Sequence, residues 1–195
     1  MRTIRKAGLV AGILVGASLL LGSLGANAQK KKSETIQANV WGQLRASGKI
    51  FNMTIIIDSY SNEDDQQTLI NAFNRGGQER LVSTLENMKS RGRVAITGTV
   101  GNSIAYVRSF PTENGRRIRI ITNRPLNFPE AYYHGRSTSY NVTLIEMNIN
   151  RLDPSKSTGS LIIGARIRVN KNTGQIEVES YGSGPWRMTN IKEWD

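Results

Sequence analysis

The amino-acid sequence predicts an α+β fold: a mainly antiparallel curved sheet or partly closed barrel of about nine strands with one inserted helical hairpin. Three observations lead to this class. Apolar and polar residues alternate over most of the chain, as they do in half-buried strands. The turns between these stretches are short, which favours antiparallel pairing because parallel strands need long crossovers. A single stretch, at about 62–90, changes to the helical period. A two-sheet sandwich is the alternative architecture.

The first 28 residues are typical of a secretory signal peptide. Basic residues precede an uncharged apolar run (7–25), and the run ends in small residues. An uncleaved membrane anchor is the alternative, but glycines interrupt the run and a cleavage site follows it. Residues 29–34 form a basic leader, which we expect to be disordered. We therefore expect an exported protein, periplasmic or extracellular, with a single β-rich domain over residues 35–195.

Two alternating stretches open this domain. Residues 36–44 place apolar side chains on one face and glutamine or asparagine on the other, and residues 51–57 repeat the alternation. The short segment 46–49 between them is predicted to be a turn. Both stretches are therefore expected to be half-buried strands.

The helical period begins near residue 62. Ser61 followed by Asp64 matches a capping box, and acidic residues crowd the first turn, where the helix dipole favours negative charge. The apolar stripe expected to face the sheet consists of Leu69, Ile70, Phe73, Leu81, Leu85 and Met88. The pair Gly76-Gly77 interrupts this stripe, so the segment is either a helical hairpin or one helix bent at the glycines.

From Arg93 onward the pattern predicts strands again. They are expected near 94–100, 104–106, 118–120, 139–152, 160–169, 175–181 and 186–191. Asn114-Gly115 is a strong hairpin signal between two of them. Residues 123–138 form the one long irregular stretch.

The composition limits the chemistry. The chain has 26 Lys and Arg against 15 Asp and Glu, a net charge of +11, which fits attraction to acidic partners as well as an ordinary solvated surface. It has no cysteine, which excludes disulfides, thiolate zinc sites and cysteine nucleophiles. His134 is its only histidine. We expect no catalytic residue, no metal site and no cofactor; the alternative is a small secreted hydrolase that uses His134.

The candidate ligand-binding residues are arginines and aromatics in the second half of the chain. They are Arg117, Arg119, Arg124, Phe128, Tyr132, Tyr133, His134 and Arg136. The planar guanidinium suits carboxylate, sulfate and phosphate groups, and basic and aromatic side chains together can bind a polyanion. Alternatively, the arginines protect an outer strand face and the aromatics plug one end of the barrel. The partner is unknown. An acidic polymer is one candidate, and a small apolar ligand is another if the barrel is hollow.

Several short motifs occur together in this chain. They are Gly76-Gly77-Gln78, Met88-Lys89, Arg116-Arg117-Ile118, Thr122-Asn123-Arg124-Pro125, Arg136-Ser137, and Tyr181-Gly182 through Arg187-Met188-Thr189-Asn190. With them the chain, from about Leu69 to Lys192, resembles a group of uncharacterised exported bacterial proteins. That group has no assigned activity, so the resemblance implies only a bacterial exported domain. We therefore expect an exported, non-catalytic binding or accessory domain of unknown ligand.

Overall fold

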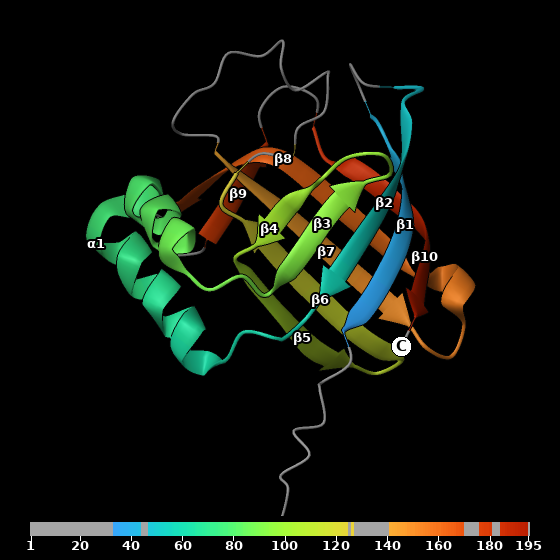
Figure 1. The fold of residues 1–195 in the computed structure, drawn as a ribbon, viewed down its shortest axis with the longest axis horizontal. Helices are drawn as coiled ribbons and strands as arrows, with labels where there is room; N and C mark the ends of the chain where they lie inside the picture. The colour runs from blue at the N-terminus through green and yellow to red at the C-terminus, as the bar shows by residue number, and fades with distance from the viewer. Residues whose placement is uncertain are drawn as a thin grey trace, which may run out of the picture. The chain divides into compact units, whose positions relative to one another are not determined.

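The computed structural model describes residues 33–43, 47–124, 126, 141–169, 176–180 and 184–194. These residues form ten strands and one α-helix (Figure 1). The strands are β1 (Glu34–Trp41), β2 (Ile50–Ile57), β3 (Gly92–Ile96), β4 (Asn102–Ile104), β5 (Tyr106–Thr112), β6 (Gly115–Thr122), β7 (Val142–Asn150), β8 (Thr158–Val169), β9 (Ile176–Ser180) and β10 (Trp186–Trp194). Helix α1 spans Glu63–Asn87, and a short 3-10 turn, η3, spans Pro154–Lys156. The predicted signal peptide and most of the leader lie outside the described residues.

The strands pair antiparallel in one continuous sheet. Its order is β4-β3-β2-β1-β10-β8-β7-β6-β5, and β9 pairs with the second half of β8. The sheet curls into a nearly closed barrel (Figure 1). Its two ends are joined by the chain itself, since β4 ends at Ile104 and β5 begins at Tyr106. The predicted α+β class with a partly closed antiparallel sheet is confirmed, in place of a two-sheet sandwich.

Alternate residues of the strands point into the barrel and form an apolar core. On β6, for example, Ile118 and Ile120 are buried, while Arg117 and Arg119 are exposed. The core also contains Ile36, Val40, Ile55, Val94, Ile104, Val107, Ile145, Met147, Leu161, Trp186 and Met188. The ring of Trp186 packs against Phe51, with ring centroids 5.5 Å apart. Burial of these side chains is the main stabilising contribution of the sheet.

Helix α1 begins with a capping box one residue later than predicted. The side chain of Asn62 accepts a hydrogen bond from the backbone N–H of Asp65 (2.9 Å), and the Asp65 carboxylate accepts one from the backbone N–H of Asn62 (3.0 Å). The prediction from Ser61 was wrong because Ser61 has another partner. It is buried, and its hydroxyl accepts a hydrogen bond from the backbone N–H of Val107 at the start of β5.

The glycine pair divides α1 into two halves. Gly76 and Gly77 have non-helical angles, and Gly77, at φ 61° and ψ −150°, adopts a conformation that only glycine takes readily. The two halves consequently run in different directions (Figure 1). The expected helical hairpin is therefore one helix with a sharp kink. Within the described residues, no helix has the length and apolar character needed to cross a membrane.

Both halves of α1 pack against the outside of the barrel, over β5 to β8. The cluster between helix and sheet contains Leu69, Leu81, Val82, Leu85, Tyr106, Val142 and Ala165, with Phe73, Met88, Ile121, Leu144 and Ile162 at its margin. One residue of the predicted stripe does not belong to it, because Ile70 is 37% exposed. The outer face of β2, β1 and β10 lies on the other side of the barrel, away from α1 (Figure 1).

The side chain of Gln78 connects the second half of α1 to the edge of β8. Its amide NH₂ donates to the carbonyl oxygen of Ala165 (2.8 Å), and its carbonyl oxygen accepts from the backbone N–H of Ile167. A neighbouring strand would make the same two kinds of bond at this edge, next to the point where β7 begins at Val142. Gln78 thus satisfies backbone groups that β7 does not reach.

Candidate functional site

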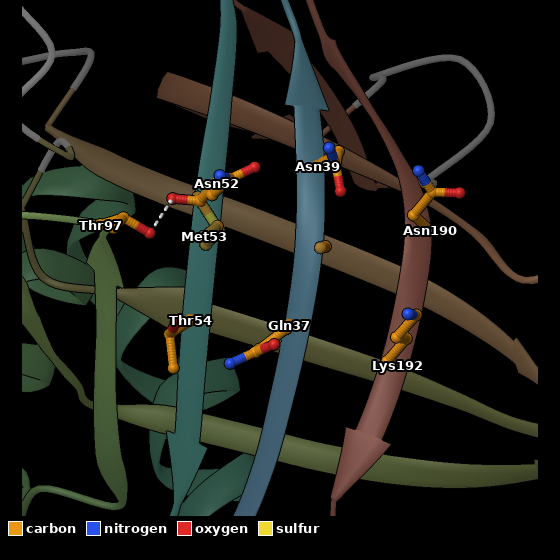
Figure 2. Close-up of a pocket in the computed structure, with 9 residues that line it drawn as sticks. Gln37, Asn39, Asn52, Met53, Thr54, Thr97, Asn190 and Lys192 are labelled. Atoms are coloured by element: carbon orange, nitrogen blue, oxygen red, sulfur yellow. Dashed lines mark hydrogen bonds between the residues drawn. The ribbon is translucent and has the colours of Figure 1, made fainter.

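A hollow of about 510 Å³ lies on the outer face of β2, β1 and β10 (Figure 2). It is lined by Gln37, Ala38, Asn39, Asn52, Met53, Thr54, Thr97, Asn190 and Lys192. The side chains of Ala38 and Met53 are buried and lie beneath it. The others carry amides, hydroxyls and one amine. This polar hollow is the candidate site.

Strand register brings the lining residues together. Asn39 is paired with Asn52 and Gln37 with Thr54 across β1 and β2, and Gln37 is also paired with Lys192 of β10. Directly opposed residues of an antiparallel sheet place their side chains on the same face, a few ångströms apart. Three adjacent strands therefore present one continuous polar surface (Figure 2).

A β-bulge in β10 shapes this surface. Ala38 of β1 stands opposite both Asn190 and Ile191, because the register shifts at this point. Asn190 has a φ of 50°, a left-handed conformation that asparagine tolerates better than most residues. The extra residue leaves Asn190 exposed while Ile191 remains buried. The bulge thereby aims a further amide outward, near Asn39 (Figure 2).

Most polar side chains of the hollow have no hydrogen-bond partner among the residues that the structure describes. Gln37, Asn39, Asn190 and Lys192 make no side-chain hydrogen bond or ion pair with any residue that the structure describes. Thr97 donates its hydroxyl to the backbone carbonyl of Asn52 (3.2 Å), not to its side chain. The side-chain amide of Asn52 likewise bonds to no residue that the structure describes. Each such amide offers two donors and one acceptor. The hollow can therefore bond a polar ligand in either direction.

Two exposed tryptophans lie on this same face, at opposite ends of β1. Trp41 is the last residue of β1 and is 42% exposed; Trp194, opposite Thr35 at the other end, is 54% exposed. The indole N–H of Trp41 donates to the hydroxyl of Thr189 on β10 (2.9 Å), which fixes the ring. The distance along β1 from Trp41 to Thr35, which is paired with Trp194, is about 20 Å at roughly 3.3 Å per strand residue.

A second polar cluster lies where β1 begins and β10 ends. Arg116 of β6 donates from Nε to Glu193 (2.9 Å) and from Nη1 to Glu34 (3.2 Å) and to the hydroxyl of Tyr60 (2.9 Å). The Tyr60 hydroxyl in turn donates to Glu34 (2.7 Å). Four side chains from β1, β6, β10 and the loop after β2 are thereby tied together.

The contacts of this cluster fix the protonation states of Tyr60 and Arg116. Burial and the hydrogen bond to Glu34 raise the pKa of the Tyr60 hydroxyl well above its ordinary value. Burial alone would lower the pKa of Arg116, but the hydrogen bonds to Glu34 and Glu193 outweigh it and raise that pKa. Neither Tyr60 nor Arg116 can exchange a proton near neutral pH. We interpret the cluster as a structural tie between strands, not as an acid–base pair.

The predicted ligand-binding residues are only partly within the described chain. Arg117 and Arg119 point outward from β6 and both neighbour Glu146 of β7. Arg119 donates from Nε and Nη2 to Glu146 (2.9 and 2.6 Å), and Arg117 lies 3.9 Å from the same carboxylate and donates to Asn148 (3.0 Å). Arg124, just after β6, is exposed. Outside the described residues lie Phe128, Tyr132, Tyr133, His134 and Arg136.

The amides of the hollow were missed as site residues by sequence reasoning. The alternation placed Gln37 and Asn39 correctly on the outer face of a strand, but such residues are common on any solvated face. A usable signal was the repeated amide at successive outward positions of one strand, together with an outward tryptophan two residues later. Register with β2 and β10 was needed to show that these positions gather with Asn52 and Lys192.

Comparison of the chain with models of protein families, with curated proteins and with solved structures finds no match. The resemblance to exported bacterial proteins therefore stays a prediction. Within the described residues, no group of three or more His, Cys, Asp or Glu side chains is placed to hold a metal ion.

Proposed function

We propose that this protein is an exported, non-catalytic binding domain whose ligand occupies the hollow on the outer face of β2, β1 and β10. The observation that carries the proposal is the lining, in which amides that bond to no described residue surround a volume of about 510 Å³. This volume is within the range of ligand sites. The lining suits a ligand rich in hydroxyl or amide groups.

The chemistry of the lining supports binding without catalysis. Side-chain amides neither transfer protons near neutral pH nor act as nucleophiles. The hydroxyl of Thr97 is engaged by the carbonyl of Asn52. Lys192 is exposed, whereas lysine nucleophiles are desolvated or held beside another cation. What these groups can do is orient a ligand through hydrogen bonds.

The export part of the proposal rests on the signal-like segment 1–28 and on the absence of cysteine. We expect the protein in the periplasm or outside the cell. Processing can be tested by determining the N-terminal residue of the protein recovered from the exterior of a producing bacterium. An N-terminus at Gln29 supports export with cleavage, and an intact Met1 in the cytoplasm contradicts it.

Nuclear magnetic resonance can test the binding site directly, because the side-chain NH₂ groups of asparagine and glutamine give their own signals. We would titrate the labelled protein with mono- and oligosaccharides, short peptides and nucleotides. A ligand of the hollow should shift the signals of Gln37, Asn39, Asn52 and Asn190. The double variant Asn39→Ala/Asn52→Ala should lose this response, while Gln67→Ala/Asn71→Ala, which removes two amides bonded to each other on α1, should keep it.

The arginine face of β6 is the alternative binding surface. Arg117 and Arg119 on this face already neighbour Glu146, so a polyanion would have to compete with this carboxylate. Arg124, just after β6, is exposed. Shifts at Arg117 and Arg119 without shifts at the hollow would favour that alternative and contradict the proposal. The hydrolase alternative depends on His134, which lies outside the described residues.

A further inference from the structure

We infer that the ligand of the hollow is a glycan chain that lies along β1 and stacks on Trp41 at one end and on Trp194 at the other. This inference rests on the proposed function, which it extends from a site to a class of ligand. It brings together three observations: two exposed indoles on one face, a row of amides between them, and strands with no free backbone edge beneath.

The two indoles are placed to act as stacking platforms. Each presents a flat apolar ring to solvent, and the apolar C–H face of a sugar ring fits against the electron-rich face of an aromatic ring. The hydrogen bond from Trp41 to Thr189 holds its ring in place before any ligand arrives, which lowers the entropic cost of binding. The distance of about 20 Å along the strand, at roughly 3.3 Å per residue, calls for a chain of several sugar units and not a monosaccharide.

The groups between the indoles match hydroxyls better than phosphates. Asn39, Asn52 and Gln37 supply neutral donors and acceptors, and a sugar hydroxyl is likewise both donor and acceptor. Lys192 is the one charged residue among the lining residues. A nucleic acid of similar length would instead need a cation for most of its phosphates, since these contacts dominate its affinity.

The position of β1 disfavours a peptide that binds as an added strand. Such peptides pair with the free edge of a sheet through backbone hydrogen bonds. The backbone of β1 is already paired along its length, with β2 on one side and β10 on the other. Only side chains are offered on this face, which is the situation that suits a ligand recognised through its own hydroxyl groups.

Tryptophan fluorescence gives the test. Cellobiose and cellohexaose, and chitobiose and chitohexaose, would be titrated into the protein, with affinity read from the change in emission of the exposed indoles. At least one hexasaccharide should bind roughly tenfold or more tightly than its disaccharide, because only the longer chain reaches both rings. Trp41→Ala and Trp194→Ala should each reduce the affinity for that hexasaccharide to near the disaccharide value. Ile70→Ala, which removes an exposed apolar side chain on α1, should leave it unchanged.

The outcomes separate the inference from the proposed function. If hexasaccharides bind no more tightly than disaccharides, or if the tryptophan variants bind as the natural protein does, the glycan inference is overturned. The same holds if peptides or nucleotides, and no saccharide, shift the amides of the hollow; the proposed function then stands. If no ligand class shifts those amides, both fail. Circular dichroism of each variant verifies that a lost affinity is not a lost fold.

Discussion

The side-chain amide of Gln78 bonds to the backbone of β8 at Ala165 and Ile167, as a strand residue would. The sequence correctly predicted that the glycines before it interrupt the helix, because glycine pairs break helices through local backbone freedom. The role of Gln78 could not be predicted, since its partners lie about ninety residues further along the chain. The glycine pair in the sequence thus predicts the kink, but only the contacts with β8 show that the residue after it, Gln78, bonds to the sheet.

The raised pKa of the Tyr60 hydroxyl predicts that the stability of the protein falls at alkaline pH. The pKa of its hydroxyl is raised in the folded protein, so above about pH 10 the unfolded chain releases this proton first. The unfolded state then binds fewer protons than the folded state, and the free energy of unfolding falls as pH rises. Below the ordinary tyrosine pKa the contribution is fully present.

Urea unfolding at increasing pH, from about pH 9 upward, measures this effect. The Tyr60→Phe variant should lose less stability over this interval than the natural protein does, although it starts lower because its hydrogen bonds to Glu34 and Arg116 are gone. Some slope should remain, since burial also raises the pKa of Tyr106. Equal slopes for the two proteins would contradict the account of the cluster.

At the scale of elements, the packing of α1 against the sheet predicts which of its side chains stabilise the fold. Leu85 is 1% exposed against the outer face of the sheet, and its truncation to alanine should cost about 2–5 kcal/mol of unfolding free energy. Ile70→Ala, at a position 37% exposed, should cost under about 1 kcal/mol. The midpoints of urea unfolding measure both. Similar costs for the two variants would mean that α1 is not docked as described.

The elements themselves were largely predictable. Alternation predicted β1, β2 and β6, because a period of two is typical of a half-buried strand. The helix start was missed by one residue because Ser61 and Asn62 are both good caps, and only the bond from Val107 to Ser61 distinguishes them. The exposure of Ile70 was missed because the kink changes which positions of the helix face the sheet.

At the scale of the whole molecule, binding of a polyanion could depend on Arg117 and Arg119 of β6 or only on the net charge of the protein, and two variants distinguish these cases. Glu146→Gln removes the carboxylate next to Arg117 and Arg119, and should allow both to reach a polyanion. The variant should elute from a heparin column at higher salt than the natural protein, since each added contact releases a counterion. Glu86→Gln changes the net charge equally at an exposed position of α1. Equal shifts for both variants would mean that overall charge, and no local surface, governs retention.

The candidate site was far less predictable than the fold. All of its residues but Thr97 come from β1, β2 and β10, and β10 lies at the opposite end of the chain from β1. Pairing of these two strands is decided by the topology of the whole sheet, which alternation does not encode. The bulge that exposes Asn190 could not be predicted from the sequence either, because asparagine is also common in turns.

The alternation of β1 gives the protein a form of evolutionary freedom. Ile36, Ala38 and Val40 belong to the folding core, while Gln37, Asn39 and Trp41 belong to the outer face. Substitutions at the second set alter the chemistry of the outer face and leave the side chains that hold the barrel together unchanged. The two sets of positions on this one strand can therefore vary independently, so the outer face can change in evolution while the core, and with it the fold, is retained.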